Sequence, residues 1–263
     1  MVGIAELIDK AYADAPPDGW TTKSIGASAV GNSCDAYLAL TLRGAPDTAP
    51  PPQLKRIFRD GHAIERAVLF DLKKAGLNIM EKDNLTGKQF KWTKFGGLIV
   101  FKADGIIDDP AGSKLLEIKS MNDAFWTRFK AYGIFISHRH YYDQMQLGMG
   151  MSGIGSCVLL AYNKDNSKYH DEEIKYDPLR YSFLLARAEA AMGKDSERIG
   201  KDETDWRCRG CSKAAYCWGR TPAPHTMRLC SSSFPQPDGT FACSYGCVDV
   251  CTAFSPFMPK ERS

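Results

Sequence analysis

Cysteines concentrate toward one end of the chain, and this distribution limits what that end can fold into. Seven of the nine cysteines lie between Cys208 and Cys251, where Cys, Pro, Ser and Gly replace the apolar periodicity of the preceding sequence. A segment with so little apolar periodicity needs something other than a hydrophobic core to order it. The sequence therefore predicts an N-terminal segment at 1–23, a core at 24–205 and a Cys-rich, metal-stapled C-terminal region at 206–263.

The chain as a whole has the composition of a folded protein. Of its 263 residues 44% are hydrophobic, which excludes disorder and suffices for one core with a small satellite. The net charge of +3 permits a polyanionic partner without requiring one. No apolar run reaches the roughly 18 residues of a membrane span, and the first residues include acids where a signal peptide needs a basic end. We therefore expect a cytoplasmic protein with no membrane partner, whose reduced cysteines bind metal rather than form disulfides.

Helical and strand-like patterns alternate along the predicted core. Helical spacing of apolar residues covers 34–42, 53–76, 138–151 and 178–192. Strand-like runs cover 77–80, 96–107, 114–119 and 156–162. Interleaved helices and strands predict the α/β class, with a mixed central sheet flanked by helices.

Two of the strand-like runs form a predicted hairpin that carries carboxylates. A DDPAGS turn joins them, and a symmetric turn puts Asp104 opposite Glu117, with Cβ atoms about 5 Å apart. Lys119 shares a face with Glu117, because side chains alternate along a strand, and is placed to steady a developing oxyanion. Two carboxylates this close repel unless a divalent cation lies between them, and oxygen ligands suit Mg²⁺ or Mn²⁺. The alternative is a solvated hairpin face with a Glu-Lys pair.

Two polar residues on the predicted helices favour the metal site. Glu65 lies on the apolar side of the helix at 53–76, where an unpaired carboxylate is costly and a metal would relieve the cost. The alternative is a helix-edge Glu65 with its carboxylate in solvent. Gln144 lies on the Met-rich helix, where an inward amide positions a water or a phosphate oxygen; the alternative has Gln146 inward instead.

Taken in chain order, these residues resemble a known motif series. Gly61 to Glu65, Asp104, Glu117-Ile118-Lys119 and Gln144 resemble the motifs of the PD-(D/E)XK nuclease superfamily, specifically its RecB-like exonuclease branch. The resemblance spans 24–220 and extends to phage relatives of the CRISPR-associated iron-sulfur exonucleases and, in YYDQMQLGM, to lambda exonuclease. It implies a restriction-endonuclease-like core and a metal-dependent DNA exonuclease.

The resemblance also assigns roles by position. It implies that Asp104 and Glu117 hold the metal with Glu65 nearby, that Lys119 is the catalytic lysine, and that Gln144 is the Gln of the Q-x3-Y motif. Each role matches the chemistry that the hairpin geometry suggests. The ordered set is more specific than its parts, because E-x-K alone is common.

The sequence departs from the branch at two positions. The branch usually has His where Glu65 stands, as in the lambda-type enzymes, and His62 is a less suitable substitute. Gly148 stands where the Q-x3-Y tyrosine would be. Tyr141 and Tyr142 are therefore the candidates to supply the contact of that tyrosine.

Three of the clustered cysteines are one ligand short of a four-coordinate site. Cys208, Cys211 and Cys217 follow the pattern C-x2-C-x5-C. Iron-sulfur members of the branch combine three such residues with one Cys upstream of the nuclease core, so the resemblance supplies Cys34. Thiolates suit Zn²⁺ and iron-sulfur clusters alike, and the spacing does not choose between them. The resemblance favours [4Fe-4S].

A second group of cysteines follows. Cys230, Cys243, Cys247 and Cys251 could close a structural Zn²⁺ site. The alternatives are exchange of ligands between the two groups and free thiols. Cys157 lies in an apolar run and is expected in the core.

Aromatic and basic residues are mixed between the hairpin and the Met-rich helix, as at single-strand binding surfaces. We predict DNA contacts by Trp126, Arg128 and Tyr141, and expect Phe125 and Phe129 to pack into the core. The predicted function is a Mg²⁺- or Mn²⁺-dependent deoxyribonuclease that acts on single-stranded or free DNA ends, in phage DNA recombination, repair or replication. The rival is a non-catalytic, zinc-containing nucleic-acid-binding protein on a nuclease scaffold. A redox role ranks last, because no motif marks a flavin or nicotinamide site.

Overall fold

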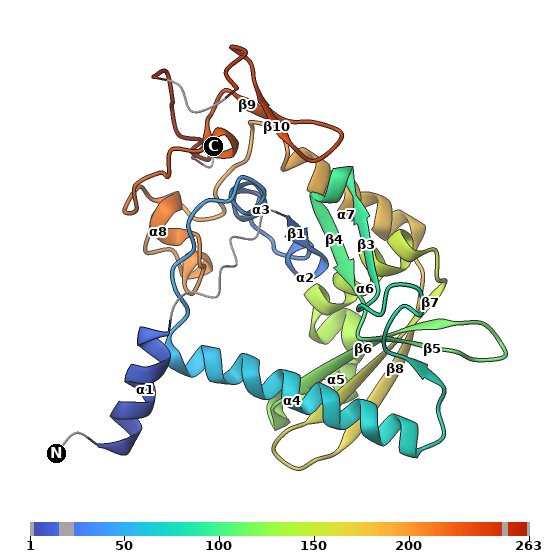
Figure 1. The fold of residues 1–263 in the computed structure, drawn as a ribbon. Helices are drawn as coiled ribbons and strands as arrows, with labels where there is room; N and C mark the ends of the chain where they lie inside the picture. The colour runs from blue at the N-terminus through green and yellow to red at the C-terminus, as the bar shows by residue number, and fades with distance from the viewer. Residues whose placement is uncertain (1–2, 16–23, 249–251, 262–263) are drawn as a thin grey trace.

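The structure, a computed structural model, describes residues 3–15, 24–248 and 252–261 (Figure 1). Its helices are α1 (Ile4–Asp14), α2 (Ala27–Val30), α3 (Asp35–Leu42), α4 (Pro52–Lys74), α5 (Asp123–Ser137), α6 (Arg139–Ser152), α7 (Pro178–Ala190) and α8 (Ala214–Cys217). Short 3-10 turns are η1 (Phe95–Gly97), η2 (Trp206–Cys208) and η3 (Met227–Leu229). The strands are β1 (Ile25–Gly26), β2 (Ile79–Met80), β3 (Lys91–Lys94), β4 (Ile99–Lys102), β5 (Gly105–Ile107), β6 (Lys114–Met121), β7 (Ser156–Asn163), β8 (Tyr169–Lys175), β9 (Ser233–Pro235) and β10 (Phe241–Cys243).

The strands form three sheets. The largest has the order β2-β5-β6-β7-β8, the second the order β1-β4-β3, and the third is the hairpin β10-β9. Within the largest sheet β6 and β7 run parallel, whereas β5–β6 and β7–β8 are antiparallel pairs. The predicted α/β class, with a mixed sheet flanked by helices, is confirmed.

Two hydrophobic clusters lie on opposite faces of the largest sheet. The long helix α4 crosses one face (Figure 1) and covers the smaller cluster, which contains Leu116 and Ile118 of β6. The larger cluster lies on the other face, against α5 and α6, and contains Leu115 and Met121 of the same strand. The alternation along β6 therefore puts Glu117 on the face of α6 and not on the face of α4.

The predicted strand at 96–107 is corrected to two strands in different sheets. β4 pairs with β1 and β3, whereas β5 pairs with β2 and β6. Asp104 lies between the two strands, and its carboxylate Oδ2 accepts a hydrogen bond from the backbone N–H of Ile118 at 2.8 Å. A side chain that takes a backbone donor competes with the strand ladder, which an apolar period-2 pattern does not reveal.

Helix α6 approaches its neighbours closely because of two glycines. A Cβ on Gly148 would lie 2.4 Å from the ring of Phe101 on β4, and one on Gly150 would lie 2.2 Å from the ring of Tyr181 on α7. Real Cβ atoms do not approach this closely, so both positions require glycine for α6 to pack where it does.

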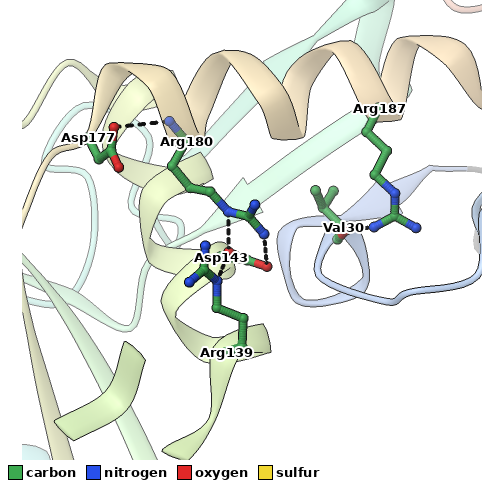
Figure 2. Close-up of polar contacts among 6 residues, drawn as sticks. All are labelled: Val30, Arg139, Asp143, Asp177, Arg180 and Arg187. Carbon is green, nitrogen blue, oxygen red and sulfur yellow. Dashed lines mark hydrogen bonds and ion pairs between the residues drawn. The ribbon is translucent and has the colours of Figure 1, made fainter. Parts of the chain in front are cut away.

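A buried carboxylate fixes α6 against α7 (Figure 2). Arg180 of α7 donates from Nε and Nη2 to the two carboxylate oxygens of Asp143, both at 2.7 Å, and Arg139 donates from Nε at 3.3 Å. The side chain of Asp177 caps the start of α7 by accepting from the N–H groups of Leu179 and Arg180. These contacts set the rotation of α6 about its axis and hence the direction in which Gln144 points.

The C-terminal region shares the larger hydrophobic core. Tyr216, Leu229 and Phe257 belong to that cluster, and the Tyr216 hydroxyl donates to the carbonyl of Phe257 at 3.0 Å. The buried guanidinium of Arg43, next to α3, donates to the carbonyl of Cys230 at 3.1 Å. The expectation that something other than a hydrophobic core orders this region is therefore corrected in part, since apolar packing contributes.

Helix α1 was not predicted from the sequence. It lies beside the start of α4, where Arg56 pairs with Asp9 at 2.7 Å and Lys55 donates to the carbonyl of Tyr12 at 2.7 Å. Among the described residues, the helices are either too short or too polar to cross a membrane.

Candidate active site

The register of the β5–β6 hairpin brings the predicted carboxylates together. Gly105 pairs with Leu116 and Ile107 pairs with Lys114. One step further along this register places Asp104 opposite Glu117, as the symmetric turn predicts. Asp104 is partly buried, and the Glu117 side chain is 3% exposed. The solvated hairpin face is therefore excluded for Glu117.

The charges of this site are unbalanced. Burial and the negative charge of Glu117 raise the pKa of the Asp104 carboxyl to about 8, against the opposing effects of the Ile118 N–H and the Lys119 ammonium. Lys119 lies 2.5 Å from Glu117, from Nζ to Oε1. Burial acts to lower the pKa of Lys119, but the charge of Glu117 and this hydrogen bond outweigh burial, so the pKa is raised. One ammonium thus compensates two carboxylates.

Gln144 completes the group from α6. Its Nε2 donates to Oε1 of Glu117 at 2.6 Å, and its own Oε1 is buried with no hydrogen-bond partner among the described residues. Gln146 is also buried, but it bonds the backbone of Lys175 and Asp177 and lies away from the carboxylates. Both glutamines are therefore inward, and Gln144 is the one that contacts the carboxylate pair. A buried acceptor without a donor is costly unless a water or ligand fills the place.

Glu65 approaches the site from the other side of the hairpin. Its negative charge is one of the causes that raise the pKa of Asp104. Its side chain is 31% exposed, and Oε2 lies 3.6 Å from Nδ1 of His62, which is well exposed. Glu65 thus lies at the edge of α4, close enough to act on Asp104 electrostatically but not buried as the sequence suggested.

Tyr141 lies beside Lys119, whose Nζ is 4.8 Å from the centre of the tyrosine ring. Of the two candidates for the missing Q-x3-Y tyrosine, Tyr141 is therefore adjacent to the site, whereas Tyr142 lies beside Arg139 and Phe135. Phe101 explains the departure itself, because its ring fills the space that a side chain at Gly148 would need. The sequence does not reveal this contact between positions 148 and 101, because it depends on how α6 packs against β4.

The predicted DNA contacts on α5 require correction. Trp126 is 7% exposed and packs edge-on against His170 of β8, so its ring is not accessible for stacking on a base. Phe129 is buried as expected, whereas Phe125 is 55% exposed and not in the core. Arg128 is exposed. The surface of α5 therefore presents Phe125 and Arg128, with Trp126 behind them.

Four cysteines from opposite ends of the chain line one pocket. Cys34 precedes α3, Cys208 and Cys211 lie in and after η2, and Cys217 ends α8. The chain brings together the four residues that the sequence and the resemblance select for one site. Cys157 lies elsewhere, buried on β7 as predicted.

The surroundings of this pocket suit a negatively charged group. Arg198, Arg207 and Lys213 are among its lining residues, and Arg207 and Lys213 also pair with Asp205 and Asp47. Two buried donors, Nε of Arg198 and Nε1 of Trp218, have no hydrogen-bond partner within the part of the chain that the structure describes. Burial raises the pKa of Cys217 to about 11, although hydrogen bonding from Arg198 opposes this effect. A free Cys217 thiol is therefore protonated, and a bound metal would have to displace its proton.

The second cysteine group is less complete. Backbone N–H groups of Tyr245 and Cys247 donate to Sγ of Cys243 and lower its pKa, and Cys230 is buried near Arg43. Cys251 lies outside the described residues. Within 3–15, 24–248 and 252–261, no group of three or more His, Cys, Asp or Glu side chains is arranged to hold a metal ion.

A magnesium or manganese ion nevertheless suits the carboxylate pair. Mg²⁺ keeps several waters and takes one or two protein carboxylates together with substrate phosphates, so Asp104 and Glu117 provide enough ligands. A hydrated cation would offset the repulsion between the two carboxylates that raises the pKa of Asp104, and one of its waters could donate to the unpartnered Oε1 of Gln144. The residues present therefore fit this ion.

Comparison with known proteins adds a weak structural likeness. No protein-family model matches the chain, and no curated protein matches it. It is similar to an alkaline exonuclease, LHK-Exo from Laribacter hongkongensis (TM-score 0.44, 19% identity, covering 65% of this chain and 87% of that chain). It is also similar to SSO0001, with a TM-score of 0.46 and 16% identity, covering 84% of this chain and 98% of that chain. A phage-related exonuclease from Haemophilus somnus 129PT is similar with a TM-score of 0.37 and 14% identity, covering 49% of this chain and 66% of that chain. Function is therefore inferred from the geometry of the site.

Proposed function

We propose that the protein is a metal-dependent deoxyribonuclease that hydrolyses phosphodiester bonds from DNA ends. The observation that carries this proposal is the convergence of Asp104, Glu117, Lys119 and Gln144 on one buried spot from a hairpin and a helix. Two carboxylates, one ammonium and one amide are the groups that metal-assisted phosphodiester hydrolysis needs.

Asp104 and Glu117 would hold Mg²⁺ or Mn²⁺. When bound, the ion polarises a phosphoryl oxygen and lowers the pKa of a water. Asp104 is oriented for this task by the N–H of Ile118, and Glu117 by the amide of Gln144. Glu65 adds negative charge at the same place and is the candidate for an outer ligand.

Lys119 and Gln144 act on the substrate side. The Lys119 ammonium has three donors, of which Glu117 uses one, so the others remain to stabilise negative charge that develops on the phosphate. The unpartnered Oε1 of Gln144 accepts a hydrogen bond from a water and so orients it. Both side chains are held in place before the substrate arrives, which avoids reorganisation during the reaction.

We further propose that Cys34, Cys208, Cys211 and Cys217 hold a [4Fe-4S] cluster, with Zn²⁺ as the alternative. The shared pocket, its cationic lining and its unpartnered donors support an anionic thiolate centre. Cys230, Cys243 and Cys247 are proposed to belong to a second structural Zn²⁺ site, to which Cys251 would contribute. The family resemblance supports a role in phage DNA recombination, repair or replication, in the cytoplasm.

The test uses the full-length protein purified without oxygen. Linear single-stranded and double-stranded DNA, labelled at one end, and a closed circular control are incubated with Mg²⁺, Mn²⁺ or EDTA. We expect metal-dependent release of nucleotides from one end of the linear DNA and an intact circle. Brown protein that contains iron would support the cluster, and zinc in colourless protein would support the alternative.

One outcome favours a different function. DNA binding without cleavage under every metal condition would contradict the nuclease proposal and favour a zinc-containing nucleic-acid-binding protein. Cleavage of the closed circle would show an endonuclease and would contradict the requirement for an end.

A further inference from the structure

Aromatic rings form a continuous line from the surface of α5 to the candidate active site. Phe125 meets His138 edge-on at 5.4 Å between ring centroids, and His138 stacks on Tyr141 at 5.7 Å. His140 lies 4.0 Å from Tyr141, and Nζ of Lys119 lies 4.8 Å from the centre of the same ring. We call Phe125, His138, His140 and Tyr141 the aromatic strip; it ends at Lys119.

The two ends of the strip are more exposed than its middle. Phe125 is 55% exposed, although Phe129, one turn further along α5, is fully buried. At the other end His140 is exposed and Tyr141 is partly buried, whereas His138, between Phe125 and Tyr141, is buried. An exposed aromatic ring that continues into a polar site has one face free for another flat ring.

The strip carries a cation near each end, Arg128 and Lys119. Its histidines add no positive charge near neutral pH, because the pKa of His138 is lowered by burial and by the nearby charges of His140 and Arg128, and the pKa of His140 by burial and by Lys119. Arg128 is exposed beside Phe125 on the same helix. Asp143 is the carboxylate that faces His140, and Arg180 and Arg139 already bind it. Cations beside stacked rings are the pattern that binds single-stranded nucleic acid.

We propose that the aromatic strip binds a single-stranded segment of the DNA substrate and leads it to Lys119, with a base stacked on Phe125 and a phosphate on Arg128. This inference rests on the proposed function and specifies its substrate. A paired base inside a duplex has both faces covered by its neighbours, so Phe125 selects unpaired bases, whereas a phosphate contact does not discriminate between strands.

The experiment measures binding in EDTA, where the proposed metal-dependent cleavage cannot occur. Fluorescein-labelled oligo(dT) and a blunt duplex are titrated with the full-length wild type, Phe125→Ala, Phe125→Trp and Phe183→Ala. Phe183 is the matched control, because it is 54% exposed but lies on α7. Thermal denaturation of each variant checks that it is folded.

We expect Phe125→Ala to weaken binding of oligo(dT) roughly ten-fold, as loss of a base-stacking ring does, and to change duplex binding less than about two-fold. Phe125→Trp should retain the affinity, and Phe183→Ala should match the wild type. Arg128→Gln should weaken the binding of both oligo(dT) and the duplex, and it should reduce the dependence of affinity on salt concentration.

Two results would overturn the inference, and they are distinguishable from failure of the proposed function. The first is that Phe125→Ala weakens binding of oligo(dT) and of the duplex equally, or weakens neither, while the enzyme still cleaves DNA with Mg²⁺. This result refutes the role of the strip and leaves the nuclease proposal intact. A wild type that neither binds nor cleaves DNA refutes both.

Discussion

The carboxylate site and the thiol pocket are built in different ways. Asp104, Glu117 and Lys119 come from one hairpin, and strand register alone places them. The thiol pocket joins Cys34 to Cys217 across most of the chain, so the tertiary fold must place it. A locally built site can lose its function while the fold survives, whereas a site that joins distant segments contributes to the stability of the fold itself.

The largest expected effect is on catalysis by the local site. Lys119→Met keeps the length and packing of the side chain but removes its charge. We expect the rate of cleavage to fall by about a hundred-fold or more, because the loss of a single donor to a developing anion typically costs this much. The temperature of unfolding should fall by a few degrees, because the buried Glu117 loses its ammonium partner, but the protein should stay folded. Lys175→Met, at an exposed position of β8, is the control and should leave the rate unchanged.

The thiol pocket should behave in the opposite way. Cys217→Ser removes one proposed ligand, so the amount of bound iron or zinc should fall. The temperature of unfolding should fall by roughly 5 °C or more, since each kcal/mol of lost unfolding free energy lowers it by about 2–4 °C in a chain of this size. Cys157→Ala, at a buried thiol outside the pocket, should keep its metal content. Elemental analysis and calorimetry measure both quantities. A Cys217→Ser protein with full metal content and stability would remove the distinction between the two regions.

Neighbouring glutamines on α6 sharpen the comparison within one helix. Gln144→Leu should reduce cleavage by about 10- to 100-fold, as loss of a group that orients a metal ligand does. Gln146→Leu should instead cost stability, about 1 kcal/mol, because it removes two part-buried hydrogen bonds to the backbone of Lys175 and Asp177. Cleavage rates per folded molecule and urea unfolding separate the effects. If Gln146→Leu lost cleavage and Gln144→Leu lost only stability, the assignment of Gln144 to the active site would be wrong.

The smallest expected effect concerns the approach of α6 to β4. Gly148→Ala places a Cβ 2.4 Å from the ring of Phe101, so we expect a loss of about 1–3 kcal/mol in urea unfolding and a smaller loss of activity. Gly155→Ala is the control, because a Cβ at that position meets nothing within 4 Å. Equal stability of the two variants would show that α6 need not lie this close to β4 for Gln144 to reach Glu117.

The sequence predicts the local site well, because its geometry follows from short-range rules. The turn between Asp108 and Ser113 sets the register that opposes Asp104 and Glu117, and a helical period aims Gln144 inward. The thiol pocket was a different case. The C-x2-C-x5-C spacing indicates three ligands, but Cys34 could be added only from the resemblance, since no local rule connects it to them.

Other features escaped prediction for physical reasons. β8 is an edge strand in which Ile174 is the one buried residue, so it lacks the apolar alternation that marks a strand. The packing of Trp126 against His170 depends on that strand, and its burial could not be foreseen. The break at Asp104 depends on a side-chain bond to the backbone of Ile118, and helix α1 buries none of its residues.

The central claim is that Asp104 and Glu117 together hold the cation on which cleavage depends. The most direct test titrates Mn²⁺ into the wild type, Asp104→Asn and Glu117→Gln, measures free Mn²⁺ by electron paramagnetic resonance, and follows DNA cleavage in the same samples. We predict that the wild type binds Mn²⁺ and cleaves DNA, that both variants stay folded, and that both lose binding and cleavage together. Wild-type cleavage in either variant, or cleavage by the wild type in EDTA, would contradict the claim.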